Sequence, residues 1–317
     1  MVFPIAFVLR PLACLVLLAG LLLAGCRASA SDALDQWVWR GSGAKESFKG
    51  SNYEGVFYEK GTLVVVGNGF NILLRKDGDP AWRTIDANTQ RPLYGVATAN
   101  GTYYAVGARG TILSSRGGEA WTARNSTVSV PLFAITYTDS VFVAVGDGGT
   151  VVTSKVGGQW SIHPTGIIDP LYGVGFFNGN FVSVGANGII LFSPDASYWL
   201  PQNSGTKAAL HGITTGKKQF VVVGDNGVIL TSPDGMLWTP RTSGTTKTLN
   251  GIAFGQGTFV AAGAEGTILT SPDGITWQAR NSGVTHFLKS VAFAHDTFVV
   301  VGWNGAILES GSLSAGK

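Results

Sequence analysis

Side chains that could act as acids and bases occupy equivalent places in a repeated Leu-x-Gly pattern and its variants. The middle position holds Glu54, His211 and Lys289 in three copies. A carboxylate, an imidazole and an ammonium group could in principle supply a general acid and a general base. Glu54 is the only carboxylate at this position, so the usual two-carboxylate route of glycoside hydrolysis has weak support. We therefore expect no catalytic residues and a protein that is not an enzyme.

Other groups of residues give even weaker signals for a catalytic, metal or cofactor site. The histidines His163, His211, His286 and His295 sit at different places in the repeat and lack metal-ligand spacing. The glycine-rich stretch from Gly146 to Thr150 resembles a phosphate-binding loop, but no Lys follows it and no helix pattern begins there. There is also no Gly-x-Ser-x-Gly elbow. The sequence therefore predicts neither a metal nor a cofactor.

The cysteine at position 26 has a more specific setting. A charge-free apolar run from Leu12 to Ala24 follows Arg10 and ends in Leu23-Ala24-Gly25-Cys26. The run is short for a transmembrane helix and has the form of a signal peptide. Its end resembles the bacterial lipobox, which implies cleavage after residue 25 and a lipid on Cys26. The alternative is an ordinary signal peptide in which the Cys occurs by chance.

Residues 26–36 are small and polar after the cysteine, which predicts a flexible tether. The lipoprotein resemblance implies an exported protein attached to a membrane by its N-terminal lipid. In that family, a residue such as Arg27 after the cysteine, rather than Asp, favours the outer membrane if the source has two membranes. Once Cys26 carries lipid, the mature chain has no second cysteine, so no disulfide can form.

Composition indicates a globular β protein. Hydrophobic residues make up 45% and charged residues 13% of the 317 residues, and the 45 glycines suggest many tight turns. Without Arg10 in the leader, the 22 basic residues become 21 against 19 acidic ones. This balance gives no reason to expect a nucleic-acid partner.

The chain is built from seven copies of one repeat of about 39 residues. A Gly that follows an apolar strand opens each copy, and all but the first copy read Gly-x-x-Gly; these first glycines are Gly67, Gly107, Gly146, Gly185, Gly224, Gly263 and Gly302. Each copy holds four short strand candidates, which is typical of a propeller blade. The last copy lacks its fourth strand, whereas residues 37–43 at the N-terminus match that strand.

We therefore predict an all-β, seven-bladed β-propeller over residues 37–310, with its last blade closed by the N-terminal strand. Residues 311–317 are expected to form a tail. Closure would remove an exposed sheet edge that invites aggregation. A two-sheet sandwich or a β-solenoid would explain neither the four-strand unit nor the split last copy.

The turn Ser-x-Asp-Gly-x-x-Trp, seen at 232–238 and 271–277, resembles a shortened Asp-box. That motif recurs in the sialidase-like propeller superfamily, and the whole pattern resembles the photosystem II stability/assembly factor-like domain. The resemblance implies a propeller that binds a protein or assists assembly. Some blades lose the Asp but keep Gly, so we interpret the motif as structural: Asp accepts backbone N–H bonds, Gly takes a positive φ, and Trp packs between blades.

Arginine recurs three residues after the Trp, at Arg40, Arg124, Arg241 and Arg280. Sialidases need a central arginine cluster, whereas these arginines fall on outermost strands. They either end and solvate edge strands or form a rim that a protein partner could grip.

Function should lie where the copies differ, because the shared residues form the framework. The middle position of the innermost strands predicts a ring at the mouth of the central channel: Glu54, Tyr94, Phe133, Tyr172, His211, Asn250 and Lys289. The Gly-x-x-Gly loops on the same face add Arg109, Asp147, Asp225, Glu265 and Trp303. This mixture suits protein or glycan contacts, although unconstrained loop residues would also vary.

We therefore expect a non-enzymatic, membrane-tethered scaffold that binds envelope proteins. The alternative is a sialidase-like propeller that binds or hydrolyses glycans.

Overall fold

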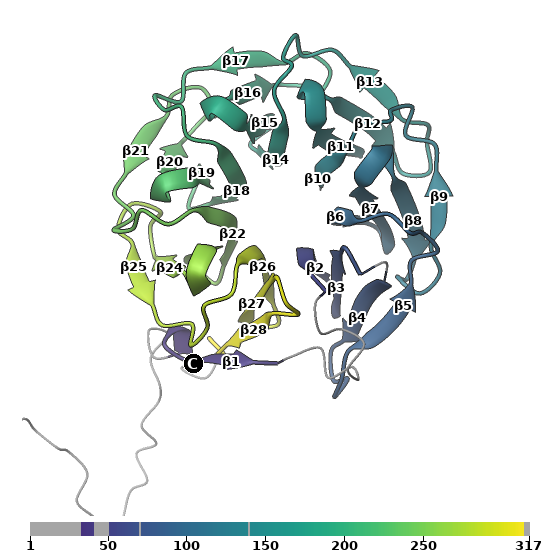
Figure 1. Ribbon diagram of the computed structural model, residues 1–317. Coiled ribbons are helices and arrows are strands. Elements are labelled where there is room, and N and C mark those ends of the chain that lie inside the picture. Colours follow the sequence, from purple (N-terminus) through teal and green to yellow (C-terminus); the bar gives the residue numbers. More distant parts are fainter. Residues whose placement is uncertain (1–32, 41–50, 70, 139, 314–317) are drawn as a thin grey trace, which may run out of the picture.

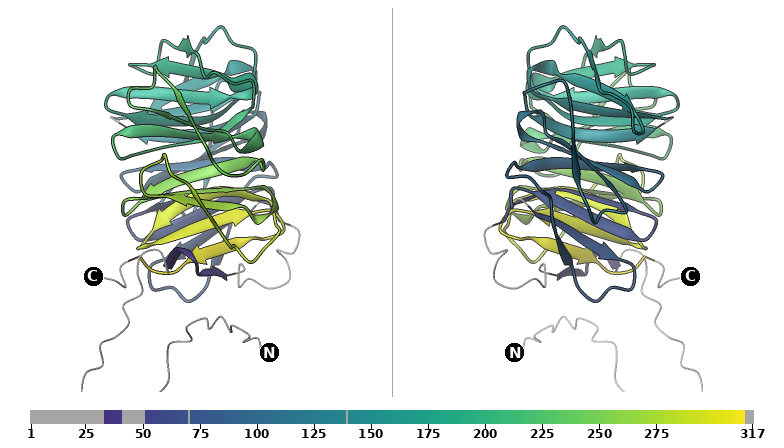
Figure 2. Two further views of the ribbon diagram at one scale, coloured as in Figure 1. Left: turned by 90° about the vertical axis from the view of Figure 1, so that its left-hand side faces the viewer. Right: turned by 90° about the vertical axis from the view of Figure 1, so that its right-hand side faces the viewer.

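The chain forms a ring of seven four-stranded antiparallel sheets around a central channel (Figure 1). The structure, a computed structural model, describes residues 33–40, 51–69, 71–138 and 140–313. The predicted seven-bladed propeller is confirmed. Seen from the side, the ring is a disc about as deep as one blade (Figure 2).

Each blade repeats the same order of strands from the channel outward. The innermost strands are β2 (Tyr53–Glu59), β6 (Leu93–Ala99), β10 (Leu132–Thr138), β14 (Leu171–Phe177), β18 (Leu210–Gly216), β22 (Leu249–Gly255) and β26 (Leu288–Ala294). The second strands are β3 (Thr62–Gly67), β7 (Thr102–Gly107), β11 (Val141–Gly146), β15 (Asn180–Gly185), β19 (Gln219–Gly224), β23 (Thr258–Gly263) and β27 (Thr297–Gly302).

The third strands are mostly buried, whereas the outermost strands are short and largely exposed. The third strands are β4 (Asn71–Lys76), β8 (Ile112–Arg116), β12 (Val151–Lys155), β16 (Ile190–Ser193), β20 (Ile229–Ser232), β24 (Ile268–Ser271) and β28 (Ile307–Ser310). The outermost strands are β5 (Arg83–Asp86), β9 (Thr122–Arg124), β13 (Ser161–His163), β17 (Leu200–Gln202), β21 (Thr239–Arg241), β25 (Gln278–Arg280) and β1 (Trp37–Trp39).

Strand β1 completes the last blade, as predicted from the split repeat. It pairs antiparallel with β28, with Trp37 opposite Ser310 and Trp39 opposite Leu308. Residues from the two ends of the chain thus share one sheet, which closes the ring and covers the edge of β28.

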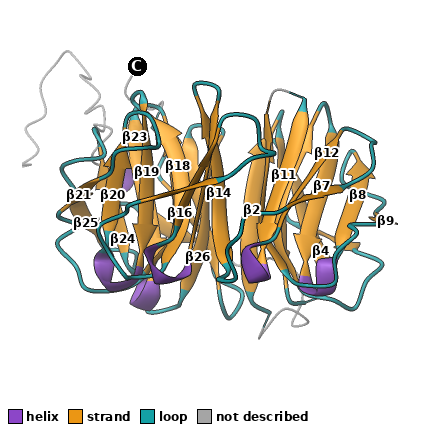
Figure 3. Ribbon diagram, turned by 90° about the horizontal axis from the view of Figure 1, so that it is seen from above, coloured by secondary structure: helices purple, strands orange, loops and turns teal. Residues whose placement is uncertain are grey.

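The Gly-x-x-Gly loops mark one face of the disc. Five of them form short 3-10 turns: η2 (Ala108–Gly110), η3 (Asp147–Gly149), η4 (Ala186–Gly188), η5 (Asp225–Gly227) and η6 (Ala264–Gly266). These turns lie together on one side of the ring (Figure 3). We call this side the η face. The innermost strands begin on it, whereas the Asp-box turns lie on the opposite face, where the third strands end.

The hydrophobic core lies between neighbouring blades. One cluster joins Val64 and Leu74 of the first blade to Leu93 and Tyr103 of the second, with Trp121 packed against them. The Trp121 indole also donates a hydrogen bond to the Gly118 carbonyl at 2.9 Å. Trp121 thus fills the gap between two sheets while its polar N–H is satisfied, which is the structural role expected from the motif.

The Asp-box geometry also matches its structural interpretation. The Asp273 carboxylate accepts the backbone N–H groups of Ile275 and Thr276, both at 2.8 Å. Gly274 has a φ of 76°. Ala196, which replaces the glycine in the fourth blade, also adopts a positive φ of 63°. The turn is therefore kept even where the sequence departs from the motif.

The recurring arginines bond to the next strand of their own sheet. Arg124 Nε lies 2.7 Å from Ser114 Oγ, and Arg280 Nε lies 2.9 Å from Thr270 Oγ1. The Arg280 side chain is only 7% exposed and pairs with Asp35. The expectation that these arginines solvate an edge is therefore wrong for Arg280, because the N-terminal segment covers it.

Both ends of the described chain pack on the disc more closely than expected. Leu34 is 4% exposed, its carbonyl accepts a hydrogen bond from the Trp37 indole at 2.9 Å, and Leu313 is 7% exposed. Residues 33–36 therefore belong to the propeller rather than to a flexible tether, and residues 311–313 likewise pack against it. Because Trp37 pairs with the end of β28, residues 33–36 approach the ring on the face opposite the η face.

Cys26, the predicted signal peptide and most of the predicted tether lie outside the described residues. Within the described part of the chain, no helix is long and apolar enough to cross a membrane.

Candidate functional site

The seven ring residues predicted from the repeat converge on one cavity at the η face. The cavity has a volume of about 610 Å³, and its lining includes Glu54, Tyr94, Phe133, Tyr172, His211, Asn250 and Lys289. One such residue comes from each blade, so the site requires the complete ring.

A β-bulge aims each of these side chains at the cavity. The pairing between the first and second strands of a blade skips one residue, as between Tyr53 and Gly55 or between Leu93 and Gly95. The skipped residues are Glu54 and Tyr94, and the same irregularity occurs in the other blades. A bulged residue is freed from the regular alternation of the strand and can be re-aimed.

In five of the seven blades the residue after the bulge is glycine, and neighbouring innermost strands approach closely there. A Cβ on Gly251 would lie 2.7 Å from the Lys289 carbonyl oxygen and 2.8 Å from Ser290 Cα. A Cβ on Gly55 would lie 2.8 Å from the Tyr94 carbonyl oxygen. Glycine therefore allows neighbouring blades to meet tightly around the channel.

An aliphatic ring below the predicted one was missed by the sequence analysis. It consists of the residue two positions after each bulged residue: Val56, Val96, Ile135, Val174, Ile213, Ile252 and Val291. The signal was available, because each of these positions holds Val or Ile in the sequence. The cavity thus has a ring of varied polar and aromatic residues at its mouth and a ring of aliphatic residues below them.

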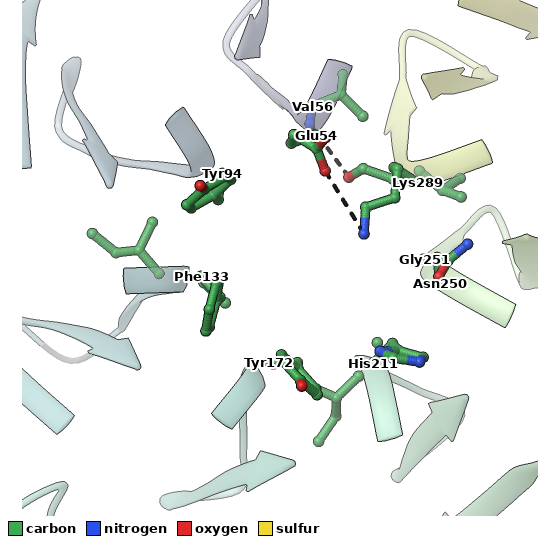
Figure 4. A pocket seen from close by; sticks show the side chains of 18 of the residues that line it. Glu54, Val56, Tyr94, Phe133, Tyr172, His211, Asn250, Gly251 and Lys289 are labelled. Carbon is green, nitrogen blue, oxygen red and sulfur yellow. Dashed lines mark hydrogen bonds and ion pairs between the residues drawn. The ribbon is translucent and has the colours of Figure 1, made fainter. Parts of the chain in front are cut away.

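One half of the mouth is a continuous arc of aromatic rings. Ring centroids are 5.6 Å apart for Tyr94 and Phe133, 5.5 Å for Phe133 and Tyr172, and 5.3 Å for Tyr172 and His211. Figure 4 shows the rings nearly edge-on, so that their flat faces border the space in the centre. Such an arc offers π surface to a ligand from four consecutive blades.

The other half of the mouth is polar. Lys289 Nζ lies 3.7 Å from Glu54 Oε2, and the Trp303 indole donates a hydrogen bond to Glu54 Oε1 at 3.1 Å. Trp303 also stacks on Phe287, with centroids 4.6 Å apart. The Asn250 amide is 8% exposed and donates to the Leu288 carbonyl at 2.8 Å. Asn250 is therefore held by the framework, whereas Glu54 and Lys289 face the cavity (Figure 4).

Burial changes the pKa values of two side chains in the site. Removal from water raises the pKa of Glu54 above its usual value, and Lys289 and Trp303 only partly offset this effect. Burial likewise raises the pKa of the Tyr94 phenol, and the charge of Glu54 adds to it. The Glu54 carboxyl group is thus partly removed from water and lies close enough to Tyr94 for its charge to affect that phenol.

The predicted loop residues divide into two groups. Trp303 contacts the ring by donating a hydrogen bond to Glu54. Asp225 contacts the ring through His211, whose Nε2 atom lies 2.9 Å from Asp225 Oδ1. Asp147 is close enough for its charge to raise the pKa of Tyr172. The remaining two, Arg109 and Glu265, do not line the cavity; the Glu265 carboxylate pairs with Lys247.

The lining gives little support to catalysis. Glu54 is the only carboxylate among the described residues that line the cavity. Within the described ranges, no group of three or more His, Cys, Asp or Glu side chains is placed to hold a metal ion. The arrangement can instead bind a ligand through stacking, one carboxylate and one ammonium group.

Comparisons with known proteins agree with this fold. Residues 34–169 match the family model described as DUF6242 beta propeller domain. The solved structure "YCF48 from Cyanidioschyzon merolae" superposes with a TM-score of 0.69 at 17% identity, over 86% of this chain and 98% of that chain. A structure described as "YCF48 bound to D1 peptide" gives a TM-score of 0.70 at 17% identity, over 87% and 97% of the two chains.

Other propellers are as similar in shape. Selenomethionine-substituted virginiamycin B lyase from Staphylococcus aureus gives a TM-score of 0.75 at 12% identity, over 87% of this chain and 99% of that one. None of the curated proteins compared with the chain matches it significantly. At these identities the likeness establishes the fold alone.

Proposed function

We propose that this protein is a non-catalytic propeller whose η-face cavity holds a segment of a partner protein at the bacterial cell envelope. One observation carries the proposal: side chains that differ from blade to blade converge on one open cavity of about 610 Å³. A framework residue would be shared by the copies, whereas these residues vary and yet meet.

Two further features support a protein partner. The mouth combines aromatic rings with few charges, which is the composition of interface cores. A propeller of similar shape is described as bound to a peptide, in the YCF48 structure with D1 peptide. The stable ring would act as a rigid scaffold, since little of the mouth must be ordered on binding.

The proposal includes export and attachment through a lipid on Cys26. Residues 33–36 approach the disc on the face opposite the cavity, so a tether to this segment would leave the η face accessible to partners. Replacing Cys26 with Ser should move the protein from the membrane fraction to the soluble fraction. Mass spectrometry of the native N-terminus should show the lipid, and its absence would contradict the anchor.

A peptide-display selection against the purified protein tests the binding function. We expect selected peptides to lose binding when Tyr94, Phe133 and Tyr172 are together replaced by Ala. The matched control replaces three exposed side chains of the Asp-box turns on the other face: Tyr198, Leu237 and Ile275. Binding that survives the first triple change, or is lost in the second, would place the interaction elsewhere.

The second candidate is carbohydrate binding, which the aromatic arc also favours because rings can stack on sugars. A glycan array would distinguish the two functions. A clear glycan signal that requires the aromatic arc, with no selected peptides, would overturn the protein-binding proposal.

A further inference from the structure

The Glu54 carboxylate has acceptor capacity that its present partners do not use. Its Oε1 atom accepts one hydrogen bond from Trp303 at 3.1 Å. Its Oε2 atom lies 3.7 Å from Lys289 Nζ, which is an ion-pair distance but longer than a hydrogen bond. An ionised carboxylate can accept about four hydrogen bonds. Glu54 can therefore receive a further donor from the cavity without giving up Trp303.

Aromatic rings border the same cavity as this carboxylate. Tyr94, Phe133 and Tyr172 form the arc with centroid separations of 5.6 and 5.5 Å. The faces of aromatic rings carry partial negative charge and attract cations within about 6 Å of the centroid. The site thus offers a cation both a carboxylate and several ring faces.

The charged groups that act on Tyr172 are also negative. Asp147, Asp225 and Asp169 act on Tyr172, and together with burial they raise the pKa of its phenol. Asp225 is further held by His211 and by Thr248 Oγ1, at 2.9 and 3.0 Å. Lys289 is the only basic residue other than His211 among the described residues that line the cavity.

We propose that the cavity accepts a cationic side chain, an arginine of the bound partner segment, whose guanidinium lies against the aromatic arc and donates to Glu54. This inference rests on the proposed function and names the chemistry that the cavity recognises. A guanidinium fits better than an ammonium group because it is planar, stacks on rings and can donate two parallel hydrogen bonds to one carboxylate.

Lys289 has a definite role in this arrangement. Its ammonium already neutralises part of the Glu54 charge, so it competes with an incoming cation. An anionic ligand would instead need Lys289 as its main partner. Changes at Glu54 and Lys289 therefore have opposite effects for cations and anions, which separates the two possibilities.

The probes are blocked pentapeptides of four glycines around one central residue, which is arginine, citrulline or glutamate. Citrulline keeps the shape of arginine but removes the charge. Titration followed by NMR should show the arginine peptide binding at least about tenfold more tightly than the citrulline peptide. Glu54→Gln should weaken binding of the arginine peptide by a similar factor, whereas Lys289→Gln should strengthen it severalfold.

Thermal unfolding of each variant establishes that the ring is intact, and Glu265→Gln, on the η face but outside the cavity, serves as the charge control. Equal binding of arginine and citrulline peptides, no binding of the arginine peptide at millimolar concentration, or tighter binding of the glutamate peptide would each overturn the inference. If display-selected peptides need the aromatic arc but carry no basic residue, the inference of a bound cation is wrong, whereas the proposed protein-binding function stands.

Discussion

Glu309 accepts a hydrogen bond from Arg40 Nε at 3.0 Å across the junction of the two chain ends. Arg40 lies just after β1, and Glu309 lies in β28. In other blades the same arginine position bonds to a neutral hydroxyl, as Arg241 Nε does with Thr231 Oγ1 at 2.9 Å. Glu309 also pairs with Arg75 of the first blade. One carboxylate thus connects the N-terminal strand, the last blade and the first blade.

Replacing Glu309 with Thr should weaken closure of the ring. The substitution copies the hydroxyl of the other blades but leaves Arg75, whose side chain is only 22% exposed, without its carboxylate. We expect the free energy of unfolding to fall by about 2 kcal/mol, as for loss of a partly buried charged hydrogen bond. Urea unfolding of both proteins would measure this loss of stability.

Glu119→Thr is the matched control, because Glu119 bridges Lys76 and Arg83 with its side chain 48% exposed. That change should leave the unfolding midpoint unchanged, since exposed ion pairs contribute little. Equal effects of the two substitutions would show that Glu309 has no special role at the junction.

Removal of the N-terminal strand should open the propeller. A protein that begins at residue 41 lacks β1 and the buried Leu34, so the edge of β28 becomes exposed. We expect aggregation and a lower melting temperature. A synthetic peptide of residues 33–40 should bind the shortened protein and reverse both effects, and calorimetry would measure that binding. No binding by the peptide would contradict closure by this strand.

The repeat in the sequence predicts the propeller because each copy carries the same turns and strands. It also predicts which residues form the ring at the cavity, since equivalent positions in equivalent blades must meet near the axis. The contacts within the ring are not predictable in this way. Trp303 donates a hydrogen bond to Glu54 across the junction of the last and first blades, and the repeat does not give the distance between these two side chains.

The bulge was also beyond the sequence analysis, because it depends on how each innermost strand pairs with the second strand of its blade. The segment at 33–36 was misassigned for a different reason. Its short, polar composition resembles a linker, yet Leu34 packs into the cluster that contains Ile268 and Leu308. Burial of Ala33 and Leu34 and the pairing of Asp35 with Arg280 hold this segment on the last blades, and composition does not report such contacts.

Gly263 should tolerate no side chain, because its backbone nearly touches the start of the innermost strand. A Cβ there would lie 2.0 Å from the Thr248 carbonyl oxygen and 2.9 Å from Leu249 Cα. Since backbone atoms cannot move away as a flexible side chain can, we expect Gly263→Ala to cost about 3 kcal/mol or to prevent folding.

Gly244→Ala provides the comparison. Gly244 has a φ of 76° and open space around its Cβ position, so only conformational strain of about 1 kcal/mol is expected. Denaturant unfolding of both variants would test the difference. Equal losses would mean that close approach does not explain the Gly shared by all seven copies.

The Asp-box of the fourth blade should make stability depend on acid pH. Backbone N–H bonds, that of Ser197 first, lower the pKa of Asp195 from 3.8 to about 2. Because the folded-state pKa is the lower one, the unfolded chain binds the proton first, and the stabilisation present above pH 4 is lost as pH falls towards 2. Asp195 is exposed, so solvent screening keeps the effect small. Urea unfolding between pH 5 and pH 2 should show a steeper loss for the native protein than for Asp195→Asn. Parallel pH profiles would contradict the assignment of this stabilisation to the ionised Asp195.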